Sequence, residues 1–401
     1  MLRSAVVLAA SLATLATATP DNEWHKCPLI SSIGNATHFT DYPLSVFEEL
    51  SVECLHLQVP MCYPNVCTSN KTLSVFLKRI PATRPTTPGK AVWLMQGGPG
   101  MSAVSMEVKM ARVYKAANGT MSLYTMDYRG AGRSSPLIAT CPEFQGMSDV
   151  VDIAGAFANC VQKLKNTYGM APKVFSVTSA ATDLAAIIQS PLLAADDVFV
   201  YGVSYGTYLV ERLMHLAPKN VKGYVLDSII SESPVRQFSD WDRDVAKIEK
   251  TYYGLCDQDP ICSSKIGPNS KQFALDLYKK LDANDTACAQ KIYAAKGLPS
   301  DFVGRLFSDM MHTYRQRNMI PAILYRLSQC VQNVDSQTHF VTALLERPLM
   351  PDDDQTASAD VLPGDKDSWK AATDTLLYNT IVMNELWVSG APMPSLDRLR
   401  H

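Results

Sequence analysis

The sequence predicts an α/β fold in which a mostly parallel sheet is covered by helices on both faces. Between about residues 51 and 230, short apolar runs rich in β-branched residues alternate with segments that are apolar at helical spacing. Such alternation is typical of βαβ units. After residue 231 the pattern is helical, and a Gly-x-Ser-x-Gly turn joins one of the earlier strands to a helix. With 47% hydrophobic residues among 401, the chain can bury a large core.

The first residues are typical of a secretory signal peptide. Residues 1–18 contain one basic side chain, Arg3, then a short apolar stretch and an Ala-x-Ala site that ends at Ala18. The alternative, an N-terminal membrane anchor, is disfavoured because the apolar run is too short to span a bilayer. We therefore expect cleavage after Ala18 and a secreted, extracellular protein that has no stable membrane anchor.

Strands and helices alternate after an irregular lead-in, which we expect over residues 19–50. Strands are expected, in order, at residues 54–59, 73–79, 91–96 and from residue 123 to 127. Helices are expected within residues 147–168 and at residues 179–188. We place Asp183 in the first turn of the second of these helices, where a negative charge is favoured by the helix dipole.

A glycine-containing turn follows the next strand, which begins at Val198. There the apolar run breaks into Gly202-Val-Ser204-Tyr-Gly206, and residues 207–216 have the pattern of a helix. A Gly-x-Ser-x-Gly turn between a strand and a helix is typical of the nucleophile elbow of α/β-hydrolases, in which the serine has a strained backbone. The positions two before and two after the serine must be small, and both are glycine. The sequence therefore predicts an α/β-hydrolase fold with Ser204 as its nucleophile.

A second glycine-rich turn, Gly97-Gly98-Pro-Gly100, follows the strand expected at residues 91–96. Acyl transfer builds negative charge on a carbonyl oxygen, and backbone N–H groups must already point towards that oxygen. We expect the N–H of Gly98 to supply one donor and the N–H of Tyr205, next to the nucleophile, to supply the other. A phosphate or dinucleotide site is the competing interpretation. It is disfavoured because the sequence contains neither Gly-x-Gly-x-x-Gly nor Gly-x4-Gly-Lys-Ser/Thr.

Four motifs carry a closer resemblance to a known family. They are Gln-Gly-Gly-Pro-Gly at 96–100, Asp-Tyr-Arg-Gly-Ala-Gly-Arg-Ser at 127–134, Gly-Val-Ser-Tyr-Gly-Thr at 202–207 and Val-Leu-Asp-Ser at 225–228. They resemble the motifs of the prolyl and tripeptidyl aminopeptidase family, a serine exopeptidase branch of the α/β-hydrolases, and its secreted tripeptidyl aminopeptidase-like members are the most similar. The resemblance covers residues from about Ser51 to Ile230 and extends faintly to about Trp387.

The resemblance implies a secreted exopeptidase that removes short N-terminal peptides or residues through an acyl-enzyme on Ser204. Its partners would be peptide substrates with a free N-terminus. Family members often carry histidine where Gln96 stands, and that side chain supports the glycine turn and is not the catalytic base. The family also implies a helical cap after the sixth strand, which ends near Asp227, with acidic residues that bind the substrate's α-ammonium group. Glu385 occupies such a place, and an ordinary helix-surface glutamate is the alternative.

The acid and the base of a catalytic triad are not recognisable in the sequence. The family places the acid in a Gly-x-x-Asp-x-x-Thr-Pro-like turn and the base in a Gly-His pair, and we find neither. The histidines that follow Ser204 are His215, His312, His339 and His401. The first lies about three helical turns beyond the serine, the next two lie in helix-like stretches, and the last is unanchored. Asp227 is a candidate acid, with a structural role in its own turn as the alternative.

Without a base, a serine hydroxyl is a poor nucleophile at neutral pH. Two interpretations stay open: a C-terminally incomplete enzyme, which we favour, and a catalytically inactive binding protein. A secreted esterase on the same fold is a further alternative. We expect a signal peptide at 1–18, the N-terminal part of the α/β-hydrolase core at 19–229, a helical cap at 230–390 and the truncated start of a C-terminal core at 391–401, the last core strands being absent.

The ten cysteines agree with secretion, because an even number in a secreted chain favours disulfides. Proximity in the sequence predicts the pairs Cys62–Cys67, Cys141–Cys160 and Cys256–Cys262, which leaves Cys27–Cys54 and Cys288–Cys330. A zinc site is the alternative at His56, Cys62 and Cys67, but their spacing matches no standard ligand pattern. N-glycosylation sequons begin at Asn35, Asn70, Asn118 and Asn284.

The charge of the chain is nearly balanced. The formal net charge is −2, from 37 basic and 39 acidic residues, and there is no long basic run. This composition gives no electrostatic footprint for nucleic acid or an anionic membrane. We expect no metal and no cofactor, and the sequence sets no oligomeric state.

Overall fold

A computed structural model describes residues 23–30, 50–141, 153–169, 171–191, 197–232, 241–311, 314–331, 335–346 and 374–386. The chain divides into two compact units, the first made of residues 1–238 and 355–393 and the second of residues 239–354 and 394–401. The signal peptide that the sequence predicts lies outside the described residues.

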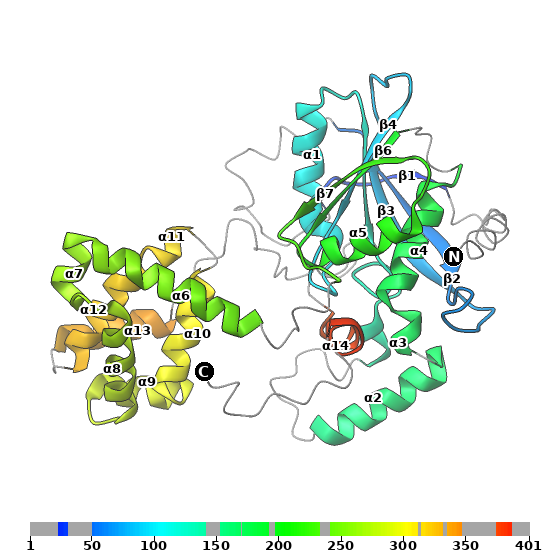
Figure 1. The fold of residues 1–401 in the computed structure, drawn as a ribbon. Coiled ribbons are helices and arrows are strands. Elements are labelled where there is room, and N and C mark those ends of the chain that lie inside the picture. Colours follow the sequence, from blue (N-terminus) through cyan, green and yellow to red (C-terminus); the bar gives the residue numbers. More distant parts are fainter. Residues whose placement is uncertain are drawn as a thin grey trace, which may run out of the picture. The chain divides into compact units, whose positions relative to one another are not determined.

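A sheet of seven described strands forms the centre of the first unit (Figure 1). The strands are β1 (His25–Lys26), β2 (Glu53–Pro60), β3 (Thr72–Ile80), β4 (Lys90–Met95), β5 (Ser122–Asp127), β6 (Asp197–Val203) and β7 (Val221–Asp227). Their order is β1-β2-β3-β5-β4-β6-β7. The pairs β5–β4, β4–β6 and β6–β7 are parallel, whereas β1, β2 and β3 join the sheet in antiparallel pairs. The predicted fold class is confirmed, and β7 is the strand that the sequence numbered sixth.

The α-helices described in the first unit are α1 (Met106–Ala116), α2 (Ile153–Tyr168), α3 (Ala171–Val174), α4 (Val177–Ile188), α5 (Tyr205–Leu216) and α14 (Thr375–Ile381), the last continued by a π-helical turn at Val382–Leu386. Helices α1 and α5 contact the strands directly. Helix α1 packs on the sheet through an apolar cluster, in which its Met106 and Met110 are buried together with Leu94 of β4 and Leu123 of β5. Burial of such side chains supplies most of the favourable free energy of folding.

The second unit is helical throughout its described part. It contains α6 (Trp241–Gln258), α7 (Pro260–Ile266), α8 (Ser270–Asp282), α9 (Ala287–Lys296), α10 (Pro299–Met311), α11 (Tyr314–Arg317), α12 (Ile320–Val331) and α13 (Asp335–Glu346). Side-chain oxygens of Asp259, Asn269 and Thr286 cap the starts of α7, α8 and α9. The unit has its own core, in which Leu281, Ile292 and Leu324 are fully buried.

Two local expectations are wrong. The lead-in is not wholly irregular, because residues 25–26 form β1, a strand too short to leave a periodic pattern. Asp183 does not lie in the first turn of its helix, because α4 begins at Val177 and is capped by Ser176. Asp183 is instead fully buried, and both of its oxygens accept hydrogen bonds from Arg129, at 2.6 and 2.7 Å. A buried guanidinium group is stable only when it is paired with an anion, and the Asp183 carboxylate is therefore buried beside Arg129.

Four of the five predicted disulfides are confirmed: Cys27–Cys54, Cys62–Cys67, Cys141–Cys160 and Cys256–Cys262. Cys288 is also disulfide-bonded. The side chain of Cys330 lies outside the described residues, so the fifth pair stays a prediction. The zinc alternative is wrong, because the Cys62–Cys67 bond consumes both thiols.

The confirmed disulfides fit an extracellular protein. No described helix is both long and apolar enough to cross a membrane. Of the predicted glycosylation sites, Asn70 and Asn118 are exposed and Asn284 is half-buried, while Asn35 lies outside the described residues.

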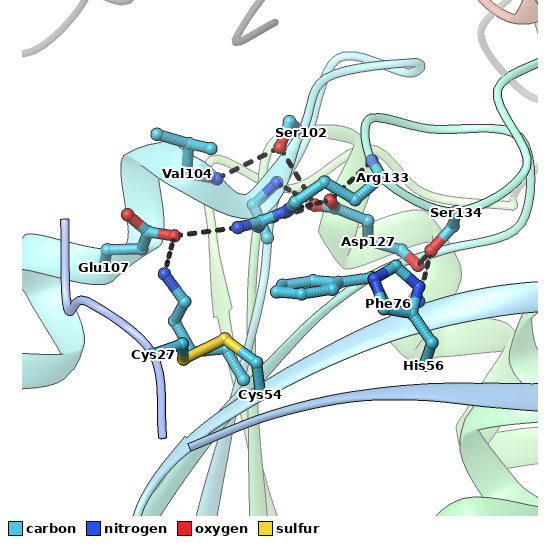
Figure 2. A network of polar contacts seen from close by, with 12 residues as sticks. Cys27, Cys54, His56, Phe76, Ser102, Val104, Glu107, Asp127, Arg133 and Ser134 are labelled. Atoms are coloured by element: carbon cyan, nitrogen blue, oxygen red, sulfur yellow. Dashed lines mark hydrogen bonds and ion pairs between the residues drawn. A yellow bond between two sulfur atoms is a disulfide. The ribbon is translucent and has the colours of Figure 1, made fainter. Parts of the chain in front are cut away.

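A buried ionic network ties β3, β5 and α1 to the turn that follows β5 (Figure 2). Asp127, at the end of β5, accepts hydrogen bonds from Ser102 and from the backbone N–H of Ala103, and it pairs with Arg133 at 2.7 Å. Arg133 and Lys78 both pair with Glu107, at 3.1 and 2.5 Å. The side chains of the four charged residues are at most 1% exposed. The network therefore fixes the segment that directly follows the turn at residues 97–100.

Candidate active site

Ser204 lies between β6 and α5 in a strained conformation, with φ 53° and ψ −126°. Non-glycine residues adopt such a backbone only where the surroundings hold it. Its N–H donates to the carbonyl of Asp227 at the end of the neighbouring strand, at 2.9 Å. A Cβ on Gly202 would lie 2.5 Å from the carbonyl oxygen of Gly206, and a Cβ on Gly206 would lie 2.5 Å from that of Met95. Both glycines of the turn are therefore required by backbone contact.

The turn at residues 97–100 lies directly beside Ser204. A Cβ on Gly97 would be 2.8 Å from the Cβ of Ser204 and 3.2 Å from the nitrogen of Tyr205. The tip of β4 and the start of α5 thus meet, although more than a hundred residues separate them in the sequence. This brings together the two segments from which we expect the oxyanion donors.

This turn, Gly97–Gly100, is named the oxyanion loop after its predicted role, and among the described residues its hydrogen bonds leave one N–H without an acceptor. The N–H of Gly97 donates to Oε1 of Gln96 at 2.7 Å, and the N–H of Gly100 donates to the hydroxyl of Tyr128. Proline at position 99 has no N–H. The N–H of Gly98 therefore remains, and Tyr205, as the first residue of α5, has an N–H without an intrahelical acceptor.

Gln96 supports the oxyanion loop, as predicted. Besides accepting from Gly97, its Nε2 donates to the hydroxyl of Ser105. Both polar atoms of the amide group are thus used in holding the loop between β4 and the start of α1.

Asp227 lies at the end of β7, where it pairs in register with Val203, the residue before Ser204. Its carboxylate accepts from the hydroxyls of Tyr201 at 2.6 Å and Ser228 at 3.1 Å. The hydrogen bond from Tyr201 lowers the pKa of Asp227 below its usual value. Its side-chain hydrogen bonds in the described residues are to hydroxyls, which fits the structural role better than that of a triad acid.

No histidine bonds to the Ser204 hydroxyl in the part of the chain that the structure describes. His215 is 66% exposed and lies 3.3 Å from Glu232. His339 is exposed on α13 of the second unit. His312 and His401 lie outside the described residues. The structure therefore brings together Ser204 and the two residues predicted as backbone donors, and among the described residues it places no histidine beside the Ser204 hydroxyl.

Glu385 belongs by its contacts to the first unit. Its Oε1 accepts from the N–H of Val177 at the start of α4, at 3.1 Å, and its carbonyl accepts from the hydroxyl of Tyr208 at 3.3 Å. Tyr208 is one helical turn after Ser204 on α5. Burial raises the pKa of Glu385, and the hydrogen bond from Val177 opposes that rise. A half-buried carboxylate therefore lies beside α5, the helix that begins directly after Ser204.

The sequence of residues 90–263 matches a family model described as the alpha/beta hydrolase fold. The chain has an α/β-hydrolase fold.

Solved structures similar to this α/β-hydrolase fold include one described as a probable hydrolytic enzyme from Pseudomonas aeruginosa. It is 19% identical, with 50% of this chain and 53% of that chain covered and a TM-score of 0.29. A mutant epoxide hydrolase from Vigna radiata is 17% identical, with 58% and 55% covered and a TM-score of 0.29. The chain thus spans about half the length of these structures. A search of the curated proteins finds no match.

In this α/β-hydrolase fold the motif at residues 127–134 is structural. Arg129 donates to the carbonyls of Pro60, Met61 and Val174 and pairs with Asp183. A Cβ on Gly132 would lie 2.6 Å from an oxygen of Asp127. The contact of Tyr128 with the oxyanion loop was missed at the sequence level, because a tyrosine within this motif carries no local signal of a partner some thirty residues away.

Proposed function

We propose that the protein is a secreted serine exopeptidase that removes short N-terminal peptides or residues through an acyl-enzyme on Ser204. The observation that carries the proposal is the strained Ser204 with the unused N–H of Gly98 and the N–H of Tyr205 on adjoining segments. The α/β-hydrolase fold and the motif resemblance support it.

The chemistry follows from this arrangement. The Ser204 hydroxyl attacks the scissile carbonyl, and the negative charge that forms on the carbonyl oxygen is stabilised by the two N–H groups. The amine leaves, and water then hydrolyses the ester on Ser204. Both steps require a general base to take a proton, which in these hydrolases is a histidine. Activation of the serine is therefore the point at which the proposal must be tested.

The first test is labelling of the secreted protein with a fluorophosphonate, followed by intact mass. We expect one adduct per chain on Ser204 and none in Ser204→Ala. A folded wild-type protein that forms no adduct would contradict the hydrolase proposal and favour the alternative of a binding protein, for which the lack of a histidine partner in the described residues is the supporting observation.

The second test separates peptidase from esterase. Peptide anilides with a free N-terminus are compared with the same anilides acetylated at the N-terminus and with a p-nitrophenyl ester. An exopeptidase is expected to cleave the anilides with a free N-terminus quickly. It should not cleave the same anilides once their N-terminus is acetylated. Turnover of the ester alone would support the esterase alternative.

Glu385→Gln is expected to raise KM for peptides with a free N-terminus about tenfold or more while sparing the ester. We propose that this carboxylate binds the substrate's α-ammonium, and hydrogen bonds to charged groups contribute about 1.5–3 kcal/mol. Because burial raises the pKa of Glu385, peptide binding should weaken as the pH falls through that raised value. Steady-state kinetics at several pH values measure both effects.

The matched control is Glu53→Gln, which neutralises a half-buried carboxylate that pairs with Arg79 on a distant strand pair. It should leave both KM values unchanged. An equal loss on peptides and esters in Glu385→Gln would contradict a role in recognising the N-terminus.

A further inference from the structure

The oxyanion loop has almost no side chains with which to fix its own backbone. Three of its four residues are glycines, and Gly98 and Gly100 have φ values of 114° and 86°. Glycine populates many backbone conformations, so partners outside the loop must select one. These partners are Gln96 at one end, and the hydroxyl of Tyr128 and the backbone N–H of Asp374 at the other.

The hydroxyl of Tyr128 bridges the two ends of the oxyanion loop. It accepts from the N–H of Gly100 and donates to the carbonyl of Gly97 at 3.4 Å. Tyr128 is only 1% exposed, and its ring lies 5.7 Å from that of Tyr205. Burial raises the pKa of Tyr128, so the hydroxyl keeps the proton that it donates.

The carbonyl of Gly97 and the N–H of Gly98 belong to the same peptide group. That group is planar and trans, so its C=O and N–H point in opposite directions. A hydroxyl that holds the carbonyl of Gly97 on the protein side therefore keeps the N–H of Gly98 on the opposite side. If this peptide group rotated, it would present a carbonyl oxygen to the developing negative charge in place of a donor.

We propose that Tyr128 is a positioning residue for the oxyanion hole, whose hydroxyl orients the Gly97–Gly98 peptide group so that the N–H of Gly98 faces the carbonyl that Ser204 attacks. This inference rests on the proposed function. It gives the tyrosine of the Asp-Tyr-Arg-Gly motif a role that differs from those of its neighbours, which hold the fold together by ion pairs.

The test is Tyr128→Phe, which removes one oxygen and keeps the ring. Removing a whole oxyanion donor costs about 10²–10³ in rate, and a donor that is present but free to turn should cost about tenfold to a hundredfold. We expect that fall in kcat for peptide anilides and in the rate of fluorophosphonate labelling, with little change in KM. Hydrogen exchange at the amide of Gly100, which loses its acceptor in this variant, should become faster at the same time.

The matched control is Tyr114→Phe, which deletes a buried tyrosine hydroxyl that donates to the carbonyl of Pro81, away from the loop. It should change neither labelling nor exchange at Gly100, and thermal unfolding verifies that both variants are folded. If the wild type is labelled and Tyr128→Phe is labelled at the same rate, the inference is overturned. A wild-type protein that is not labelled at all contradicts the proposed function, and whether the Tyr128 hydroxyl holds the loop is then decided by the exchange at Gly100 alone.

Discussion

Replacing Gly206 with alanine is expected to destabilise the first unit by about 3 kcal/mol or more. The new Cβ would lie 2.5 Å from the carbonyl oxygen of Met95 and 3.0 Å from that of Gln96. Both atoms belong to the backbone of β4 and its end, between two parallel neighbours, so neither can move without disturbing the sheet. Urea unfolding of the purified protein measures the loss as a lower midpoint at unchanged slope.

The control for this substitution is Gly304→Ala in α10, where a Cβ meets no atom within 4 Å. Alanine is favoured over glycine inside a helix by about 1 kcal/mol, so this variant should be as stable as the wild type or slightly more stable. A Gly206→Ala protein with an unchanged midpoint would show that α5 does not approach β4 as closely as described.

Asp127→Asn is expected to cost about 3–5 kcal/mol at neutral pH, the usual cost of removing one partner of a buried ion pair. Asparagine keeps the shape of the side chain but removes a carboxylate that pairs with the buried Arg133, and Glu107, which also pairs with Arg133, is shared with Lys78. Urea unfolding measures this loss. The control is Asp227→Asn, which removes a carboxylate that is exposed to solvent and should change the midpoint little.

Stability should also depend on pH through Asp127. Burial alone would raise the pKa of Asp127, but the charge and hydrogen bonds of Arg133 outweigh it and hold the pKa below its usual value. A carboxyl with a lowered folded-state pKa stabilises the protein above its unfolded pKa of about 3.9, and this contribution is lost as the pH falls through the folded value. The difference in thermal midpoint between wild type and Asp127→Asn should therefore shrink below about pH 4. A difference that stays constant would contradict the ion pair.

The sequence predicted those strands, helices and turns that depend on residues close together in the chain. The strand expected at residues 91–96 is found at Lys90–Met95, and the helix after Ser204 begins at Tyr205, because hydrophobic periodicity and glycine requirements act over a few residues. The disulfides with short separations were predictable for the same reason.

The contacts that shape the candidate site join residues far apart in the sequence. Glu385 reaches Val177 across 208 positions, and Asp183 was misplaced because its partner, Arg129, lies on another element. The sequence around each of these residues gives no indication of its partner. The same is true of Tyr128, whose partners could be found only once the oxyanion loop had been placed beside it.

The N–H of Asp374 donates to the carbonyl of Gly100 at 2.9 Å, and Leu377 packs against Gly130. During biosynthesis the ribosome produces the oxyanion loop first, then the helices of the second unit, and only afterwards this last support. The nascent chain therefore carries Ser204 for a long interval before the loop beside it reaches its final form. Until that support is made, the loop depends on its contacts with Gln96 and Tyr128.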